Sequence, residues 1–327
     1  MLSLLNVLGA AVSGSLDFMV IGDWGGQPSA PYYTPAEYAV AQDLGERVKS
    51  VNASFTVALG DNFYTVGIPT DVNDPRFQET FEDVFKSPNV QGDNFFRVLA
   101  GNHDHIGNVS AEVAYSKKSE RWYFPSLWYE FTAQSDDGAT VQFVMIDTPT
   151  LAGQSLVPTG EVDAHGQPQF RELHGDELPG PADKALADEQ WAWINKTLHA
   201  STADFLLVGG HYPVYSICEH GPTSLLDAKL KPMLLSSKAT AYLAGHDHCA
   251  ELLEDEGIQH HGIGAAHLCD ISTAHSDAVP KGSLKWHYDA GKASTSEKGV
   301  YAHFSITKAG MQVRRDRGLH SISASCT

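Results

Sequence analysis

Five short segments of the chain carry side chains that bind hard metal ions, and each segment follows an apolar run. The segments are residues 22–25, 60–64, 101–104, 209–211 and 245–248. The candidate ligands within them are carboxylates, imidazoles, one amide and one phenol: Asp23, Asp61, Tyr64, Asn102, His211, His246 and His248. Oxygen and nitrogen donors of this number and kind are enough for two neighbouring metal ions that share one bridging ligand.

The apolar runs before these segments predict the elements that must position them. Runs rich in valine, isoleucine, leucine and phenylalanine are typical of buried strands, and they span Phe18–Ile21, Phe55–Leu59, Phe95–Ala100, Val141–Ile146, Phe205–Val208 and Ala239–Ala244. Helical patterns lie between them at Pro35–Val51, Pro75–Phe85, Ala111–Ser119, Asp183–His199 and Ser224–Ser236. Alternating strands and helices predict an α/β fold. In such folds ligands bind beyond the carboxyl ends of strands, which is where all five segments stand.

Each segment taken alone has a simpler interpretation. An aspartate beside a glycine is common in turns and helix caps, and a single histidine such as His211 is more often part of a core or a surface. The five segments together, in order and each after an apolar run, favour a metal site over five unrelated turns.

The chain resembles the metallophosphoesterases of the calcineurin-like superfamily and, within them, the purple acid phosphatases. The patterns D-x-G, G-D-x-x-Y, G-N-H-D/E, a histidine after an apolar strand, and G-H-x-H are all met in the five segments. The likeness extends over residues 17–315 and is greatest to the small tartrate-resistant type found in animals. It implies an α/β fold of two packed β-sheets flanked by helices, built from βαβαβ units, with one catalytic domain over residues 16–327.

The resemblance also implies a role for each candidate residue. A ferric ion would be held by Asp23, Tyr64 and His248. A divalent ion, which could be iron, zinc or manganese, would be held by Asn102, His211 and His246. Asp61 would bridge the two ions, and the residues facing the substrate would be His103 and His220. A tyrosine at position 64 selects the purple branch, so its phenolate is expected to give a charge-transfer colour.

The activity implied by the resemblance is acid hydrolysis of phosphate monoesters, by direct attack of a hydroxide activated at an Fe(III)–M(II) centre. The substrates would be small molecules or phosphoproteins. Two other activities stay open from the sequence. One is a nucleotidase or phosphodiesterase of the same superfamily, and the other is a redox-active di-iron protein that generates reactive oxygen species.

Charge and the N-terminus bear on partners and location. The chain of 327 residues has 22 basic and 40 acidic residues, a net charge of −18, so we expect neither nucleic acid nor a membrane as partner. We expect a monomer. The apolar run Leu2–Val12, followed by small residues, predicts a signal peptide over residues 1–15. Together with glycosylation sequons at Asn52, Asn108 and Asn195, it predicts a secreted or lysosomal/endosomal glycoprotein.

The four cysteines, Cys218, Cys249, Cys269 and Cys326, match no zinc-binding spacing. The animal tartrate-resistant enzymes have a disulfide whose two positions here are Ala152 and Leu225, so that bridge is not carried over. We expect that Cys249 and Cys269 could pair instead.

The segment Ala152–Pro181 is rich in glycine, proline and acidic residues and has little periodicity. A segment of this length and composition is either an exposed flap near the site or a spacer without a role. It lies where the related family has a protease-sensitive regulatory loop, but it is longer and different, so the resemblance does not carry regulation by cleavage over to this chain.

Overall fold

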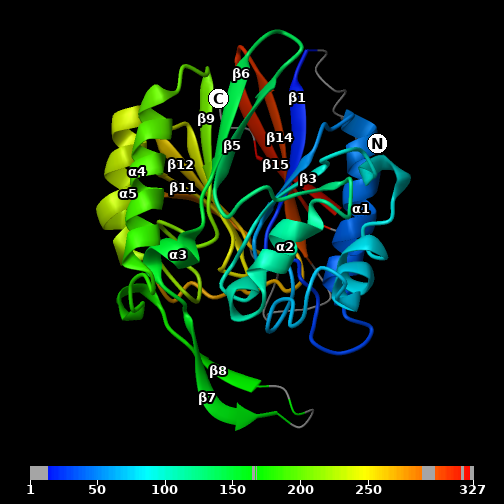
Figure 1. Ribbon diagram of the computed structural model, residues 1–327. Coiled ribbons are helices and arrows are strands. Elements are labelled where there is room, and N and C mark those ends of the chain that lie inside the picture. The colour runs from blue at the N-terminus through cyan, green and yellow to red at the C-terminus, as the bar shows by residue number, and fades with distance from the viewer. Residues whose placement is uncertain (1–13, 164–165, 167, 289–298, 318–319, 325–327) are drawn as a thin grey trace, which may run out of the picture.

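Two large β-sheets pack against each other, and helices cover their outer faces (Figure 1). This arrangement confirms the predicted α/β fold of two packed sheets flanked by helices. The computed structural model describes residues 14–163, 166, 168–288, 299–317 and 320–324. Most of the predicted signal peptide, residues 1–13, lies outside the described residues.

The first sheet has the strand order β16-β15-β14-β1-β2-β3-β4. Its strands are β1 (Leu16–Ile21), β2 (Thr56–Leu59), β3 (Phe96–Leu99), β4 (Trp122–Tyr123), β14 (Val300–Thr307), β15 (Gly310–Arg317) and β16 (His320–Ala324). β1 to β4 are parallel, as expected for continuous apolar runs buried on both faces. β14 and β15 form an antiparallel hairpin, and β14 pairs antiparallel with β1.

The second sheet has the order β13-β11-β12-β10-β9-β6-β5. Its strands are β5 (Tyr129–Gln134), β6 (Thr140–Met145), β9 (Phe205–Gly209), β10 (Ala241–Ala244), β11 (Ala250–Asp255), β12 (Ile258–Ile263) and β13 (Leu284–His287). β6, β9, β10 and β12 run parallel to one another. Side chains from both sheets form the core between them, where the Phe18 ring packs edge-on against Phe143.

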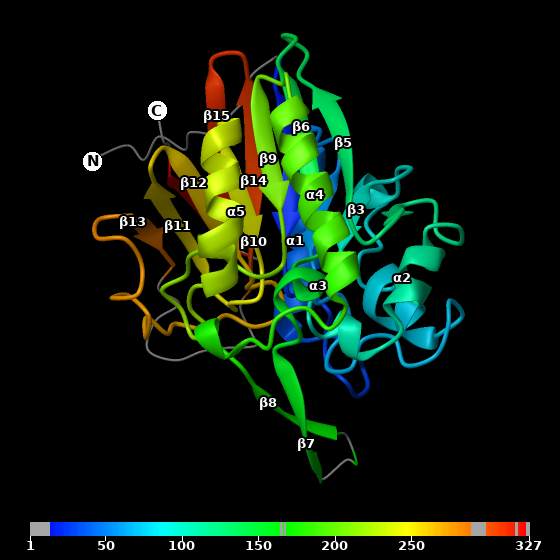
Figure 2. The ribbon, with the colours of Figure 1, turned by 60° about the vertical axis from the view of Figure 1, so that its left-hand side comes forward.

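The helices lie on the outer faces of the two sheets. They are α1 (Pro35–Val51), α2 (Val109–Tyr115), α3 (Thr148–Ala152), α4 (Lys184–Ala200) and α5 (Ser224–Ser237). Figure 2 shows α4 and α5 side by side over the second sheet, and their apolar side chains join a separate buried cluster there. α1 begins at Pro35, as predicted. Thr34 and Glu37 stabilise this start by capping it reciprocally.

Short helical turns occur at Phe77–Glu82, Pro88–Val90, Asp104–Ile106 and Gly175–Glu177. The first of these is a π-helical segment within the predicted helix Pro75–Phe85. Phe81 and Phe85 from this region pack around Trp24 in a cluster of aromatic rings, so aromatic packing accompanies the wider helical turn. In the part of the chain that the structure describes, no helix has the length and apolar character needed to cross a membrane.

Within the segment Ala152–Pro181 the chain forms an antiparallel hairpin of β7 (Leu156–Val162) and β8 (Pro168–Glu172). The hairpin projects from the body at the lower end of the view in Figure 1. Its strands are exposed along most of their length, but Glu172 at the end of β8 is half-buried against the candidate site. The structure thus has the exposed flap predicted near the site.

Candidate metal centre

Four of the predicted ligands meet around the hydroxyl group of Tyr64. This oxygen lies 3.1 Å from Asp23 Oδ1, 3.0 Å from Asp61 Oδ2 and 3.0 Å from His248 Nε2. The ligand atoms of Asp23, Asp61 and His248 are all close enough to one another to bind one ion. They come from the loops after β1, β2 and β10, which end at the same edge of the two sheets.

A second group of predicted ligands meets at His211. Its Nε2 atom lies 2.7 Å from Asn102 Oδ1 and 3.4 Å from Asp61 Oδ1. The ring of His246 packs against that of His211 with centroids 5.2 Å apart. Asp61 therefore has one oxygen toward the Tyr64 group and the other toward the His211 group, which is the arrangement expected of a bridging carboxylate.

The hydrogen bonds of His211 fix which ring nitrogen faces the site. Its Nδ1–H donates to the carbonyl oxygen of Leu59 at 2.8 Å, so Nε2 is the nitrogen that presents a lone pair inward. Nε2 then faces acceptor oxygens of Asn102 and Asp61, while Asn102 Nδ2 is buried with no hydrogen-bond partner among the described residues. Acceptors that converge in this way would be stabilised by a cation between them.

Three of the predicted ligands have a backbone conformation that side-chain-bearing residues rarely adopt. Asp23, Asp61 and His246 have φ angles of 54°, 51° and 70°. A non-glycine residue in the left-handed region costs on the order of 1–3 kcal/mol and persists only where surrounding contacts impose it. Here the backbone amide of His246 donates to both oxygens of Asp23, at 3.1 and 2.8 Å, which ties two of these turns together.

Glycines next to the ligands leave room for the donor atoms. A Cβ atom on Gly101 would lie 2.1 Å from Asp61 Oδ1, and one on Gly245 would lie 2.5 Å from Asp23 Oδ2. Neither glycine needs a positive φ, so it is close approach, not a sharp turn, that excludes a side chain at these two positions.

The charges of this cluster fit a bound cation. Asp23 and Asp61 are buried together, and in the described part of the chain they form ion pairs with histidines and not with lysine or arginine. Burial, reinforced by these two carboxylates, raises the pKa of the Tyr64 phenol well above its usual value. Burial also lowers the pKa of His246, which favours the neutral imidazole that binds metals. The residues present therefore suit a pair of metal ions.

The two predicted substrate-facing histidines pack against different members of this cluster, His103 against Tyr64 and His220 against His246. His103 Nδ1–H donates to Thr65 O at 2.7 Å, and its Nε2 lies 3.8 Å from Asp61 Oδ2. His220 Nδ1–H donates to Asp247 Oδ1 at 2.8 Å, and its ring centroid is 4.4 Å from that of His246. In both rings Nδ1–H is bonded to a protein acceptor, and this bond sets the orientation of the ring and the position of Nε2.

The flap supplies a partner for His220 that the sequence did not predict. Glu172 Oε2 lies 3.1 Å from His220 Nε2. Burial alone would lower the pKa of His220, but hydrogen bonds to Asp247 and Glu172 outweigh it and raise that pKa well above its usual value. A glutamate in a segment without periodicity has no sequence signal, because only the fold of the hairpin brings it to the site.

Asp104 is a second residue whose role sequence analysis missed. Its carboxylate accepts hydrogen bonds from the backbone amides of Asn62, Phe63 and Gly101, at 2.8 to 3.2 Å. It therefore joins the loop of Asp61 and Tyr64 to the loop of Asn102. The G-N-H-D pattern contains Asp104, and that pattern is the signal that could have identified it.

His267 contacts two of the predicted ligands, although no motif in the sequence singles it out. Its ring stacks on Tyr64 with centroids 4.1 Å apart, and its Nδ1–H donates to Asp23 O at 2.7 Å. It thus holds the phenol ring of Tyr64 in place from the side of β1.

The expected pairing of Cys249 with Cys269 is wrong. Cys249 forms a disulfide with Cys218. Pairing was not predictable from spacing, because it depends on the loops after β9 and β10, which are neighbours only in the folded sheet.

Comparison with known proteins identifies the family of the chain. The family model for calcineurin-like phosphoesterases matches residues 16–250. The tartrate-resistant acid phosphatase type 5 of Oryctolagus cuniculus is 42% identical over 95% of this chain and 90% of its own length. That of Sus scrofa is 44% identical over 91% of this chain and 82% of its own.

A solved structure described as GAP50, the anchor in the inner membrane complex of Plasmodium, is similar in fold. Its TM-score is 0.73 at 19% identity, with 96% of this chain and 90% of that chain covered. At this identity the likeness bears on the fold alone. The sequence relatives and the family model carry the assignment further: the chain belongs to the calcineurin-like phosphoesterases and, within them, to the purple acid phosphatases of the tartrate-resistant type, which are phosphoric monoester hydrolases.

Proposed function

We propose that this chain hydrolyses phosphate monoesters in acid with two metal ions held by the seven converging donor side chains. The observation that carries the proposal is that two groups of donors meet at Asp61, one oxygen of which faces each group. A single-ion site would not need a second set of ligands on the far side of the same carboxylate.

The chemistry of the donors supports a different ion in each group. Asp23 and Tyr64 offer anionic oxygens, which suit a hard ferric ion, and His248 adds one imidazole nitrogen to this group. Asn102, His211 and His246 offer neutral imidazoles and an amide, which suit divalent iron, zinc or manganese. When bound, such a pair lowers the pKa of a water molecule and neutralises the charge of a phosphate group.

His103 and His220 would act on the substrate directly. Their fixed nitrogens leave His103 Nε2 and His220 Nε2 as the donors available to phosphate oxygens or to the leaving alkoxide. Protonated imidazole serves both tasks, which is consistent with work in acid. Because Glu172 contacts His220 Nε2, a substrate bound at that nitrogen would have to share or displace this carboxylate.

The same structure supports a location in an oxidising compartment. The Cys218–Cys249 disulfide forms and persists in such compartments, and the sequon residues Asn52, Asn108 and Asn195 are exposed. We infer that the protein is a secreted or lysosomal/endosomal glycoprotein. Its substrates would be small-molecule or phosphoprotein monoesters.

The test is hydrolysis of an aryl phosphate monoester and of a bis-aryl phosphate diester at pH 5 by the metal-loaded enzyme. The proposal expects a higher kcat/KM for the monoester and a loss of about 100-fold in kcat for His103→Ala. Preference for the diester would favour the phosphodiesterase alternative. Peroxide-dependent oxidation without hydrolysis would favour the redox protein.

A further inference from the structure

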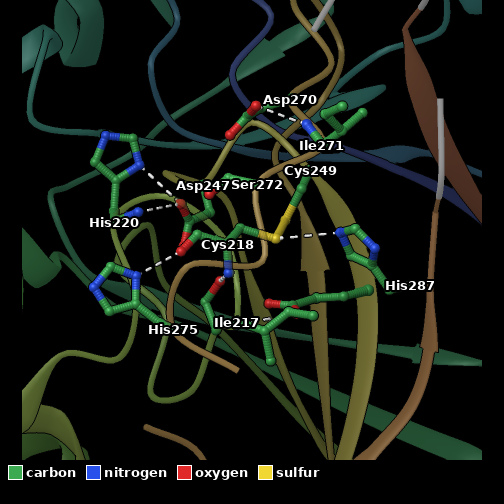
Figure 3. Close-up of a disulfide and its surroundings, with 12 residues drawn as sticks. Ile217, Cys218, His220, Asp247, Cys249, Asp270, Ile271, Ser272, His275 and His287 are labelled. Atoms are coloured by element: carbon green, nitrogen blue, oxygen red, sulfur yellow. Dashed lines mark hydrogen bonds and ion pairs between the residues drawn. A yellow bond between two sulfur atoms is a disulfide. The ribbon is translucent and has the colours of Figure 1, made fainter. Parts of the chain in front are cut away.

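A disulfide ties together two loops of the candidate site. Cys218 and Cys249 are bonded and fully buried. Cys249 directly follows His248, and Cys218 precedes His220 by two positions. Figure 3 shows the bond beside His220 and Asp247. The cross-link therefore connects the loop of a proposed metal ligand to the loop of a proposed substrate-facing histidine.

The loop that carries His220 has little regular structure of its own. Residues 210–223 form neither helix nor strand between β9 and α5. Such a segment lacks the continuous backbone hydrogen bonds that fix a side chain on a helix or strand. Its conformation must come from contacts with its neighbours, and the site requires that conformation to be well defined.

Asp247 supplies one set of these contacts. Its carboxylate accepts hydrogen bonds from the backbone amide of His220 at 2.7 Å, from His220 Nδ1–H at 2.8 Å and from the amide of Gly221 at 3.2 Å. Asp247 lies two residues before Cys249. The disulfide and these hydrogen bonds therefore join the same two loops at adjacent points.

The residues around Cys218 hold that end of the disulfide in place. His275 Nδ1–H donates to Cys218 O at 2.7 Å, and the backbone amide of His275 donates to Ile217 O at 3.0 Å. The amide of Ile217 donates to Glu251 Oε2 at 3.3 Å. β11 and the segment around His275 both contact the loop at Ile217 and Cys218. These contacts and the cross-link together restrain the backbone two residues before His220.

A metal site at these sulfurs is a weaker interpretation. Cys218, Cys249 and His287 are close enough together to bind one ion, and Cys218 Sγ lies 3.6 Å from His287 Nε2. Metal binding requires thiolates, and the disulfide uses both sulfurs. The geometry favours a covalent cross-link at the site over a third metal position.

We propose that the Cys218–Cys249 disulfide is a positioning element for His220, so that turnover depends on it. The proposal rests on the function proposed above for the site. Without the cross-link, the loop loses a covalent restraint two residues from His220. A displacement of about 1 Å in a catalytic group can cost on the order of 100-fold in rate, so even a partial shift should lower kcat by about tenfold or more.

The test compares wild type with the double variant Cys218→Ala, Cys249→Ala, which removes the bond without leaving a free thiol from it. We expect kcat for the aryl phosphate to fall about tenfold, with metal content unchanged. In a His220→Ala background the same double change should have no further effect on kcat, because the cross-link acts through His220. Additive losses in that background would overturn the proposal.

Amide hydrogen exchange of the metal-free proteins gives a readout independent of activity. Peptides from residues 211–223 should exchange faster in the double variant, whereas peptides from β1 should be unchanged. The matched control is Leu234→Ala in α5, which removes buried side-chain volume from the same apolar cluster as the disulfide but leaves the cross-link and the residues of both loops unchanged. It should lower the melting temperature but leave kcat at wild-type values.

Other outcomes also bear on the positioning role of the disulfide. Loss of metal in the double variant would mean that the bond acts through His248, which would overturn the role assigned to His220. Unchanged kcat and exchange would exclude any positioning role. If the alanine pair does not fold, Cys218→Val with Cys249→Ala fills more of the space for the same measurements. An inactive wild type would refute the proposed function, while the exchange comparison would still test the restraint.

Discussion

Replacing Gly101 with alanine should disable the metal centre through one added methyl group. The Cβ atom would lie 2.1 Å from Asp61 Oδ1, 2.5 Å from Asp61 N and 2.8 Å from His211 Cε1. Rotation of the Asp61 side chain alone would not relieve this, because its backbone nitrogen is also too close. The candidate bridging carboxylate and a candidate ligand of the divalent ion would both have to move.

The size of the effect follows from these distances. Ordinary contact with a Cβ atom begins at 3.4 Å, so Asp61 Oδ1 would have to withdraw by the difference between 3.4 and 2.1, about 1.3 Å. A shift of that size costs on the order of 100-fold in turnover. Overpacking a buried site also costs about 1–3 kcal/mol in the free energy of unfolding. We therefore expect a folded protein with a lower melting temperature.

The assay is metal content per chain by mass spectrometry, together with kcat on an aryl phosphate and the melting temperature. Gly92→Ala is the matched control, because a Cβ there meets only Phe95 at an ordinary 3.8 Å. It should leave all three quantities at wild-type values. A Gly101→Ala protein with two bound ions and wild-type kcat would refute the assignment of Asp61 as the bridge.

Three further predictions concern single side chains. Tyr64→Phe should abolish the visible absorption band of the iron-loaded protein, and a retained band would contradict its role as a ligand. Asn102→Ala or His211→Ala should leave one metal ion per chain by metal analysis. Two ions per chain in either variant would exclude the replaced residue as a metal ligand. Burial would raise the pKa of Asp17, but hydrogen bonds from His303 and Ser15 outweigh it and lower that pKa. Ionised Asp17 therefore stabilises the folded protein above about pH 4, and this contribution is lost as the pH falls through the lowered pKa of the folded state. Acid unfolding of Asp17→Asn should lack this dependence.

The positions of the candidate ligands were predictable because each follows a buried strand. Apolar runs before Asp23, Asp61 and Asn102 identify β1, β2 and β3, and the carboxyl ends of parallel strands meet at one edge. The same reasoning placed His211 and His246 after β9 and β10. Local periodicity was therefore enough to predict which residues the fold would bring together, and the family resemblance supplied their expected roles.

The remaining parts of the site depend on contacts that no local pattern encodes. Glu172 reaches His220 only because the segment around it folds into the hairpin β7–β8. The pairing of Cys218 with Cys249 depends on the lateral order of strands β9 and β10. Supporting residues of this kind have no fixed spacing from the ligands they serve, so sequence analysis does not single them out.

The most direct test of the account is a crystal structure of the iron-loaded protein with anomalous scattering recorded at the iron absorption edge. The account predicts two metal positions about 3.5–4 Å apart, one on each side of the Asp61 carboxylate, with Tyr64 on one ion and His211 on the other. A single metal position, or two positions that do not share Asp61, would contradict it.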